Sequence, residues 1–137
     1  MSRRIAREIV LKSLFQIDFN DELDIDNALN NVVKGNDFLE KDELFAKELL
    51  KGTKENLQKI DEEIDSYAKT WTVKRMSKVD RNIIRIAVYE MFMAKEPIPT
   101  SVSINEAVEI AKEYSTIEAA KFINGVLGNM ARYKTNG

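Results

Sequence analysis

Histidine and cysteine are both absent from the 137 residues of this chain. Without them the chain cannot carry a Ser–His–Asp triad, a thiolate nucleophile or a zinc site built from histidine and cysteine ligands. Its five glycines stand apart from one another, so no glycine-rich loop is available to hold a phosphate group. Catalysis by carboxylates or lysines remains open in principle. With 23 acidic residues in the chain, however, two carboxylates are expected to lie close together by chance, so such a pair is weak evidence for an active site. We therefore predict a protein that is not an enzyme and that holds neither a metal ion nor a cofactor.

Long apolar segments are absent as well. No run approaches the roughly 18 residues that a membrane-spanning helix needs, and the charged start of the chain leads into no apolar segment typical of a secretory signal. The expected location is the cytoplasm, with no membrane partner. Only two prolines interrupt the chain, and a composition of 44% hydrophobic and 32% charged residues is typical of a compact soluble domain. We expect one domain over residues 1–137, built mainly from long helices.

The chain is slightly acidic overall, but its N-terminus is basic. The net charge is −2, yet residues 1–16 carry four basic side chains against one acidic side chain, a local charge of +3. The basic side chains are Arg3, Arg4, Arg7 and Lys12, and the acidic one is Glu8. Residues 18–43, by contrast, hold nine acidic side chains and two lysines. A polyanion such as RNA should therefore meet the N-terminal end; a solvated helix start is the alternative, although arginines in a first turn oppose the helix dipole.

Apolar residues recur at the three- and four-residue spacing of helices along most of the chain. The spacing predicts an all-α protein. The expected helices are one from a cap at Ser2 to about Phe19, a short one capped by Asp24 or Asp26, and others over about 42–69, 77–95, 103–114 and 115–132.

Several residues predict where these helices begin, break or join. Capping boxes start at Ser77, Ser103 and Ser115, and Gly52 is a point where the longest helix can loosen or split. The linker residues Trp71 and Met76 are expected to pack between two helical halves. The predicted halves span about 1–70 and 71–137.

The helix over 115–132 contains residues that simple burial does not explain. Phe122 lies at the margin of the apolar face, near Glu118 and Lys121. It either stacks on an unpaired base or packs at the edge of the core. Gly125 and Gly128 each cost about 0.8–1.0 kcal/mol relative to alanine inside a helix, so we expect another backbone to approach closely there.

The helix over 77–95 carries a carboxylate near the centre of its apolar face, at Glu90. A buried carboxylate must be paired or hydrogen-bonded, and free amides at the start of a neighbouring helix are one candidate partner. We predict a structural role for Glu90. The opposite face is mixed in character and suits either a protein partner or a neighbouring helix; it carries Arg81, Arg85, Val88 and Phe92.

Several blocks of the sequence resemble the NusB family. From the N-terminus onward these blocks are RRIARE (3–8), LFQ (14–16), VDRNIIRIAVYEM (79–91), IP (98–99), VSINEAVEIAK (102–112) and KFINGVL (121–127). The last two blocks are long and specific. The resemblance covers nearly the whole chain, with the segment 20–70 matched by helical pattern only.

The resemblance implies a seven-helix fold of two small packed bundles that form one domain. It also implies binding of single-stranded boxA RNA in leader and ribosomal transcripts, together with the ribosomal protein NusE, within an antitermination complex on RNA polymerase. The family's RNA-contacting positions correspond to Arg3, Arg4, Arg7, Glu118, Lys121 and Phe122. Its NusE-facing positions correspond to Phe15, Asp80 and Arg85. The alternative is a helical adaptor that binds only protein and leaves its arginines solvated.

Overall fold

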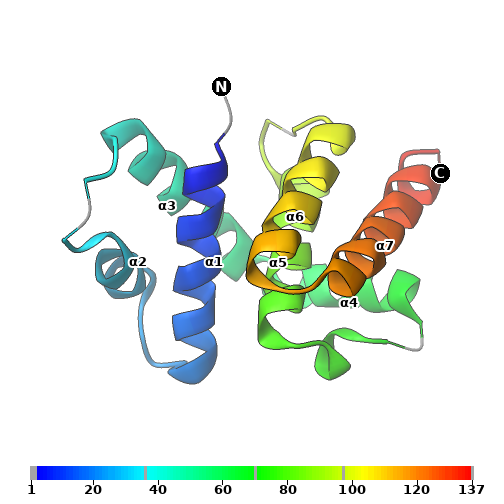
Figure 1. Ribbon diagram of the computed structural model, residues 1–137, viewed down its shortest axis with the longest axis horizontal. Coiled ribbons are helices and arrows are strands. Elements are labelled where there is room, and N and C mark those ends of the chain that lie inside the picture. Colours follow the sequence, from blue (N-terminus) through cyan, green and yellow to red (C-terminus); the bar gives the residue numbers. More distant parts are fainter. Residues whose placement is uncertain (1–2, 36, 70, 97, 137) are drawn as a thin grey trace.

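The computed structural model describes residues 3–35, 37–69, 71–96 and 98–136, which fold into helices and turns without a strand (Figure 1). A 3-10 turn, η1 (Val73–Arg75), precedes α5, and a π-helical turn, η2 (Tyr89–Met93), follows it. The α-helices are α1 (Arg4–Phe19), α2 (Ile25–Val33), α3 (Glu40–Glu55), α4 (Leu57–Ala68), α5 (Lys78–Val88), α6 (Thr100–Tyr114) and α7 (Ile117–Asn136). The prediction of an all-α fold with seven helices is confirmed within these residues.

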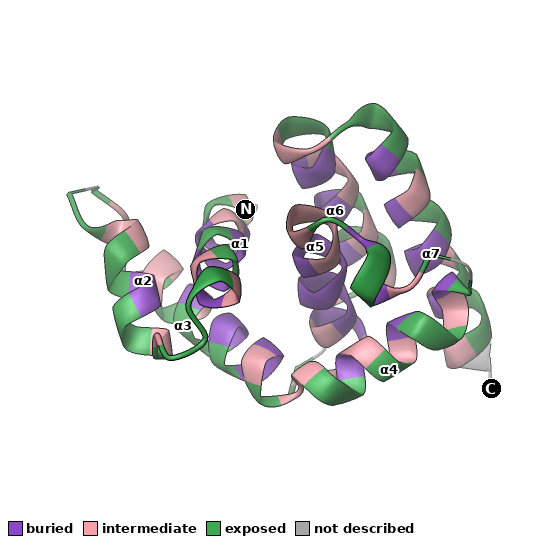
Figure 2. Cartoon of the chain, turned by 90° about the horizontal axis from the view of Figure 1, so that it is seen from below, coloured by how far each residue is buried: buried purple, intermediate pink, exposed green. Residues whose placement is uncertain are grey.

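The helices form two packed groups, α1–α3 and α4–α7 (Figure 1). Helix α1 belongs to the first group and joins it to the second, packing on α2 and α3 on one side and on α5 on the other. Helix α4 lies against α5 and α7, as the view from below shows (Figure 2). Buried apolar side chains from both groups join in one cluster, which includes Val10, Leu50, Ile64, Ile84, Ile123 and Leu127. The two groups therefore share a single core.

The helix predicted over 42–69 is divided in two at Asn56. Helix α3 ends at Glu55 and α4 begins at Leu57, while Asn56 itself has φ −108° and ψ 16°, outside the helical range. The Asn56 side-chain amide donates a hydrogen bond of 2.8 Å to the backbone carbonyl of Gly52. A side chain bonded to the carbonyl of the preceding turn competes with continuation of the helix. The single-helix prediction is therefore wrong, and the break lies at Asn56 rather than at Gly52.

Gly52 instead makes room for a side chain of the other group. A Cβ atom at this position would overlap the ring of Tyr89, the first residue of η2. The helix predicted over 77–95 stops being α-helical at Val88, and the Ala94 N–H then donates to the Tyr89 carbonyl at 2.9 Å, the long bond of a π turn. The helical segment ends at Met93, close to the predicted end at about Lys95, but its last turn is π-helical, which the local spacing did not reveal.

The predicted helix starts are partly correct. Asp24 caps α2 and Ser77 caps α5, each accepting a hydrogen bond from a backbone N–H three residues further on, at 2.7 and 3.1 Å. The predicted cap at Ser2 lies outside the described residues. Arg3 occupies the N-cap position of α1, and its side chain makes no capping hydrogen bond.

The other two capping boxes are wrong. Helix α6 begins directly after Pro99, so that Ser103 is buried within the first turns instead of preceding them. Proline suits a helix start because its fixed φ and missing N–H cost nothing there. In α7 the cap is Thr116, whose hydroxyl accepts from the Ala119 N–H at 2.9 Å, and not Ser115.

The linker between α4 and α5 is anchored by two buried side chains, Val73 and Met76, which are each 5% exposed. Trp71 is 46% exposed. The expectation that Met76 packs into the core is confirmed, whereas the expectation that Trp71 does so is wrong.

The two helical glycines of α7 also differ from the expectation. A Cβ atom at Gly125 or Gly128 would meet nothing within 4 Å outside its own helix turn, so no backbone of another described element approaches closely there.

We expect Gly52→Ala and Gly125→Ala to change stability in opposite directions. At Gly125 alanine gains helix propensity, about 0.8–1.0 kcal/mol, with no contact to disturb. At Gly52 the same gain is outweighed by overpacking against the Tyr89 ring, which costs about 1–3 kcal/mol. Thermal denaturation followed by circular dichroism measures both, with about 3–4 °C per kcal/mol for a chain of this size. Two shifts of the same sign would contradict the Gly52–Tyr89 contact.

Candidate nucleic-acid and partner interfaces

The three arginines predicted to contact RNA lie at the start of α1 in three different environments. Arg3 is exposed, and its guanidinium carbon lies 4.1 Å from the ring centre of Phe45 on α3. The Arg4 side chain is 35% exposed and ion-paired, and Arg7 is buried. Of the three, Arg3 presents its charge most openly to a ligand.

Arg7 forms a buried ion pair with Glu90, between α1 and η2. Its Nε donates to one carboxylate oxygen at 2.9 Å and its Nη2 to the other at 2.7 Å. Glu90 is only 2% exposed, so the predicted buried carboxylate is confirmed, with a guanidinium as its partner instead of helix amides. Arg7 therefore fixes α1 against η2, and its predicted contact with RNA would require this pair to open.

Arg4 joins α1 to α6 through a second carboxylate, that of Glu106. Its Nε and Nη2 donate to the two oxygens at 2.8 and 2.9 Å. The hydrogen bond from Arg4 lowers the pKa of Glu106, against the opposing effect of burial, and the same pair raises the pKa of Arg4. Glu106, expected to close a capping box, thus binds the N-terminal arginines instead.

An open groove of about 840 Å³ lies beside these arginines, between α1 and α3 on one side and η2 and α6 on the other. Basic and acidic side chains share its walls, so its charge alone does not select an anion. Its lining includes Arg3, Phe45, Glu48, Tyr89, Lys95 and Val102.

The second set of predicted RNA contacts lies on α7. Glu118 and Lys121 are exposed, whereas Phe122 is half-buried and packs against the core. Lys121 lines an open groove of about 740 Å³ between α6 and α7, together with Asn105, Lys112, Ile117 and Asn124. Sequence reasoning did not single out Lys112 or Asn124, although both lie in or beside the blocks that resemble the family.

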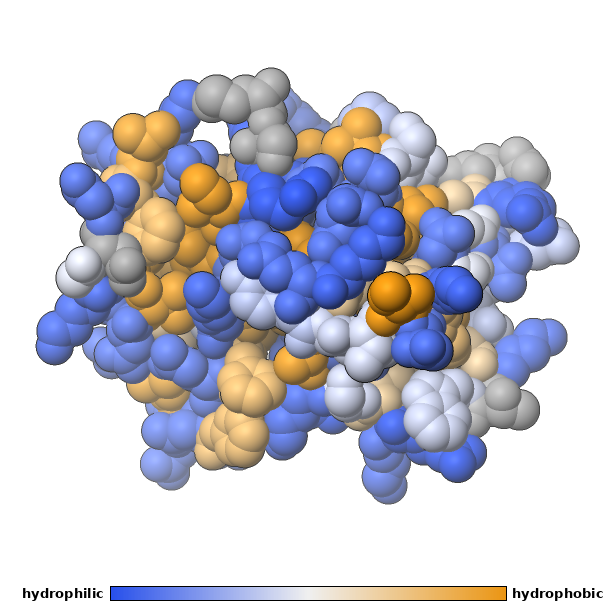
Figure 3. Space-filling model, viewed as in Figure 1, coloured by the Kyte–Doolittle hydropathy of each residue, from blue (hydrophilic) through white to orange (hydrophobic). Residues whose placement is uncertain are grey.

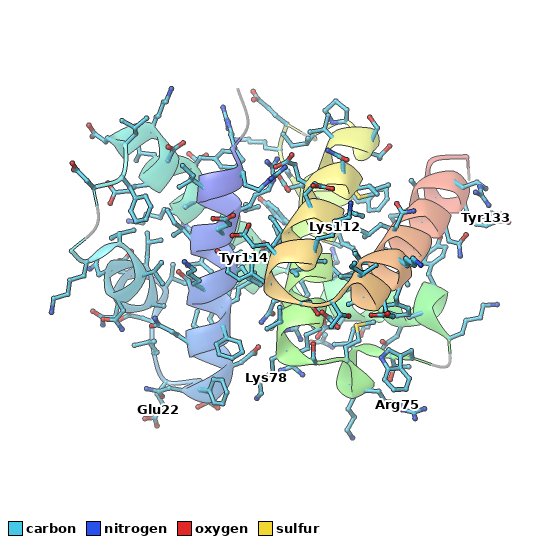
Figure 4. All side chains as sticks on the ribbon, viewed as in Figure 1. Glu22, Arg75, Lys78, Lys112, Tyr114 and Tyr133 are labelled. Atoms are coloured by element: carbon cyan, nitrogen blue, oxygen red, sulfur yellow. The ribbon has the colours of Figure 1, made fainter. Side chains whose placement is uncertain are left out.

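Helix α6 separates the two sets of predicted RNA contacts. Glu106 on α6 holds Arg4, while the neighbouring Asn105 lines the groove that contains Lys121. Figure 4 shows α6 with Lys112 between α1 and α7. A strand of RNA that touched both sets would have to cross α6.

Phe15, the first residue predicted to face a protein partner, belongs to an exposed aromatic pair. Phe15 and Phe19 are 37% and 68% exposed, and their rings meet edge to face with centres 4.9 Å apart. The Lys78 ammonium lies 4.8 Å from the centre of the Phe19 ring, and Asp80 follows in the first turn of α5. Figure 3 shows hydrophobic surface gathered on the α1–α3 side of the molecule. Sequence reasoning missed Phe19, although its four-residue spacing from Phe15 places both on one helix face.

Arg85, in contrast, lies inside the protein. It is 6% exposed and donates two hydrogen bonds of 2.8 and 2.7 Å to the carboxylate of Asp61 on α4, and a third of 2.9 Å to Asn82. Val88 on the same side of α5 is fully buried. Of the two interpretations left open for this part of α5, the structure supports a neighbouring helix.

Neither a metal site nor a membrane span is found in the parts of the chain that the structure describes. No group of three or more acidic side chains there is placed to hold a cation. None of the described helices is both long and apolar enough to cross a bilayer.

Comparison with known sequences gives matches along most of the chain. A family model described as the NusB family matches residues 4–132. The transcription antitermination protein NusB of Pelotomaculum thermopropionicum is 48% identical over 130 residues, covering 95% of this chain and 89% of that protein. The protein of the same name from Bacillus licheniformis is 42% identical, covering 95% of this chain and 96% of its own length.

Solved structures share the fold. The T. maritima NusB structure matches with a TM-score of 0.84 at 38% identity, over 97% of this chain and 92% of that chain. A chain from a crystal structure of the antitermination factors NusB and NusE in complex with dsRNA matches with a TM-score of 0.81 at 26% identity. That match covers 97% of this chain and 96% of the other.

Proposed function

This chain belongs to the NusB family, and we propose that it acts as a transcription antitermination factor that binds boxA RNA together with NusE. It is not an enzyme, in keeping with the family of antitermination proteins to which it belongs. The observation that carries the proposal is the match, over 95% of the chain, to relatives named transcription antitermination protein NusB. The similar chain solved with NusE and dsRNA supports the two partners. The proposed place of action is the antitermination complex on RNA polymerase, in the cytoplasm.

For RNA, the proposed first contacts are the exposed guanidinium of Arg3 and the half-buried guanidinium of Arg4. Guanidinium groups suit this role because they bind phosphates bidentately and stack on bases. Arg7 supports them from the interior by fixing α1 through Glu90. Lys121 supplies a further cation across α6, next to Glu118 and the partly exposed edge of Phe122.

For NusE, the proposed contact is the surface of Phe15, Phe19, Lys78 and Asp80. Exposed aromatic side chains next to charged groups are typical of protein-binding surfaces. Arg85 acts from beneath, because its ion pair with Asp61 holds α5 on α4. This surface includes the C-terminal end of α1, whereas Arg3 precedes its N-terminal end, so both partners can bind at once.

Binding of single-stranded boxA RNA in the presence of NusE is expected to weaken with salt. Each neutralised phosphate contributes a slope of about −0.7 in a plot of log affinity against log salt concentration. Contacts from Arg3, Arg4 and Lys121 therefore predict a slope of about −2. Fluorescence anisotropy over a salt series measures it.

Two single substitutions make this test specific. Arg3→Gln should reduce the slope by about 0.7, because one phosphate contact is lost. Lys59→Gln removes the same charge from an exposed site on α4 and should leave the slope unchanged. Failure of the wild-type protein to bind boxA RNA even with NusE present would favour the protein-only adaptor.

A further inference from the structure

The linker that joins α4 to α5 is the most basic segment of the chain outside the N-terminus. Residues 66–79 contain four basic side chains and no acidic one, a local charge of +4 in a chain whose net charge is −2. The four are Lys69, Lys74, Arg75 and Lys78. Within the described part of the chain, no carboxylate forms an ion pair with Lys69, Lys74 or Lys78. The exposed charges of Lys69 and Lys74 are therefore available to a ligand.

An exposed aromatic ring lies among these cations. Trp71 is 46% exposed, and the Arg75 guanidinium carbon lies 4.7 Å from the centre of its ring. Lys69, Lys74 and Arg75 are exposed as well. We call Lys69, Trp71, Lys74 and Arg75 the basic strip; Figure 4 shows Arg75 at the lower edge of the molecule.

The backbone that carries Lys74 and Arg75 is anchored to the protein. The backbone N–H of Val73 donates to the Asp65 carboxylate at 2.7 Å, and Val73 and Met76 are buried beneath the strip. The turn η1 then sets Lys74 and Arg75 next to each other on the outside. Groups fixed before binding lose less conformational entropy when a ligand arrives.

We propose that the basic strip is a second binding site for single-stranded RNA, which takes phosphates at its lysines and a base against Trp71 and Arg75. Unpaired bases stack on aromatic rings and on guanidinium planes, and lysines next to such rings track the backbone of single-stranded nucleic acid. The proposal rests on the proposed function, because it adds a site for the same kind of ligand.

The basic strip is separate from the N-terminal arginines of the proposed boxA site. Arg3 precedes the first residue of α1 near the N-terminus at the upper edge of the molecule, whereas Arg75 of the basic strip lies at the lower edge (Figures 1 and 4). A helix of 16 residues is about 24 Å long. A short boxA strand at the N-terminal arginines would leave the strip unused, whereas a longer transcript would reach both sites. A second contact on the same RNA raises the overall affinity by increasing the effective concentration.

The test compares a short RNA that contains only boxA with the same boxA extended at both ends by unstructured uridines, each with and without NusE. The wild-type protein should bind the long RNA more tightly and with a steeper salt dependence. Trp71→Ala should lower affinity for the long RNA about fivefold or more, from the lost base stack. The double variant Lys69→Gln/Lys74→Gln should reduce the salt slope for the long RNA by about 1.4. Neither variant should change binding of the short RNA.

The matched control is Lys51→Gln/Lys59→Gln, which removes two exposed lysines from α3 and α4. Unchanged binding of the long RNA by both strip variants would overturn the proposal, as would equal losses for short and long RNA. A loss of NusE binding without any loss of long-RNA binding would also overturn it, because the strip would then be a protein contact. If the wild-type protein binds neither RNA, the proposed function fails; if it binds both RNAs equally, only the second site fails.

Discussion

Replacing Glu90 by alanine is expected to lower the free energy of unfolding by about 3 kcal/mol. Removal of one partner of a buried ion pair costs about 3–5 kcal/mol, because the other charge is left without compensation in the interior. Here that charge is the guanidinium of Arg7, whose side chain is 5% exposed. The lower end of the range applies because an oxygen of Glu106 lies 3.7 Å from Arg7 and still attracts it. Urea denaturation followed by circular dichroism measures the change.

Two further variants separate the lost charge from the lost volume. Glu90→Gln keeps the shape and part of the hydrogen bonding, and should cost about 1–2 kcal/mol. The double variant Arg7→Met/Glu90→Leu removes both charges and should cost less than Glu90→Ala, because no unpaired ion remains. If Glu90→Ala unfolds like the wild-type protein, the carboxylate does not carry the contact between α1 and η2.

Replacing Arg85 by alanine is expected to lower the free energy of unfolding by about 2–3 kcal/mol. The loss leaves the carboxylate of Asp61 without two hydrogen bonds from Arg85, and the side-chain oxygen of Asn82 without the one that it accepts from Arg85. The Asp61 side chain is 27% exposed, so water takes up part of the lost interaction and the cost stays below that of a fully buried pair. Arg85→Glu would set a third carboxylate beside Asp18 and Asp61 and should prevent folding.

A surface substitution provides the comparison. Lys78→Glu changes a half-buried side chain over the Phe19 ring, so it should weaken NusE binding while leaving the melting temperature within about 2 °C of the wild-type value. The main effect of Arg85→Ala should be a lower melting temperature. Any weakening of NusE binding should be indirect, caused by a shift of α5. A stable Arg85→Ala variant that loses NusE binding would show instead that the guanidinium contacts the partner directly.

Local physical chemistry determined much of this protein. The three- and four-residue apolar spacing placed the helices because burial of one face repeats with the helical turn. The caps at Asp24 and Ser77 followed from side chains that bond the first free amides of a helix. The burial of Glu90 followed from its position on the apolar face of the helix predicted over 77–95, and the resemblance of whole sequence blocks indicated the family.

The tertiary structure alone decided which groups meet. Arg7 and Glu90 are separated by 83 positions in the chain, and a helix pattern gives the direction of each side chain but not the element that it faces. The same holds for Arg85 on α5. The sequence left open whether this face meets a protein partner or a neighbouring helix, and the structure shows that Arg85 bonds to Asp61 on α4. The wide turn at Tyr89 exists together with its contact at Gly52, on another helix. Whether a side chain is exposed, and which residue it pairs with, depends on how the helices pack. That packing is set by the whole core and not by any short segment of the sequence.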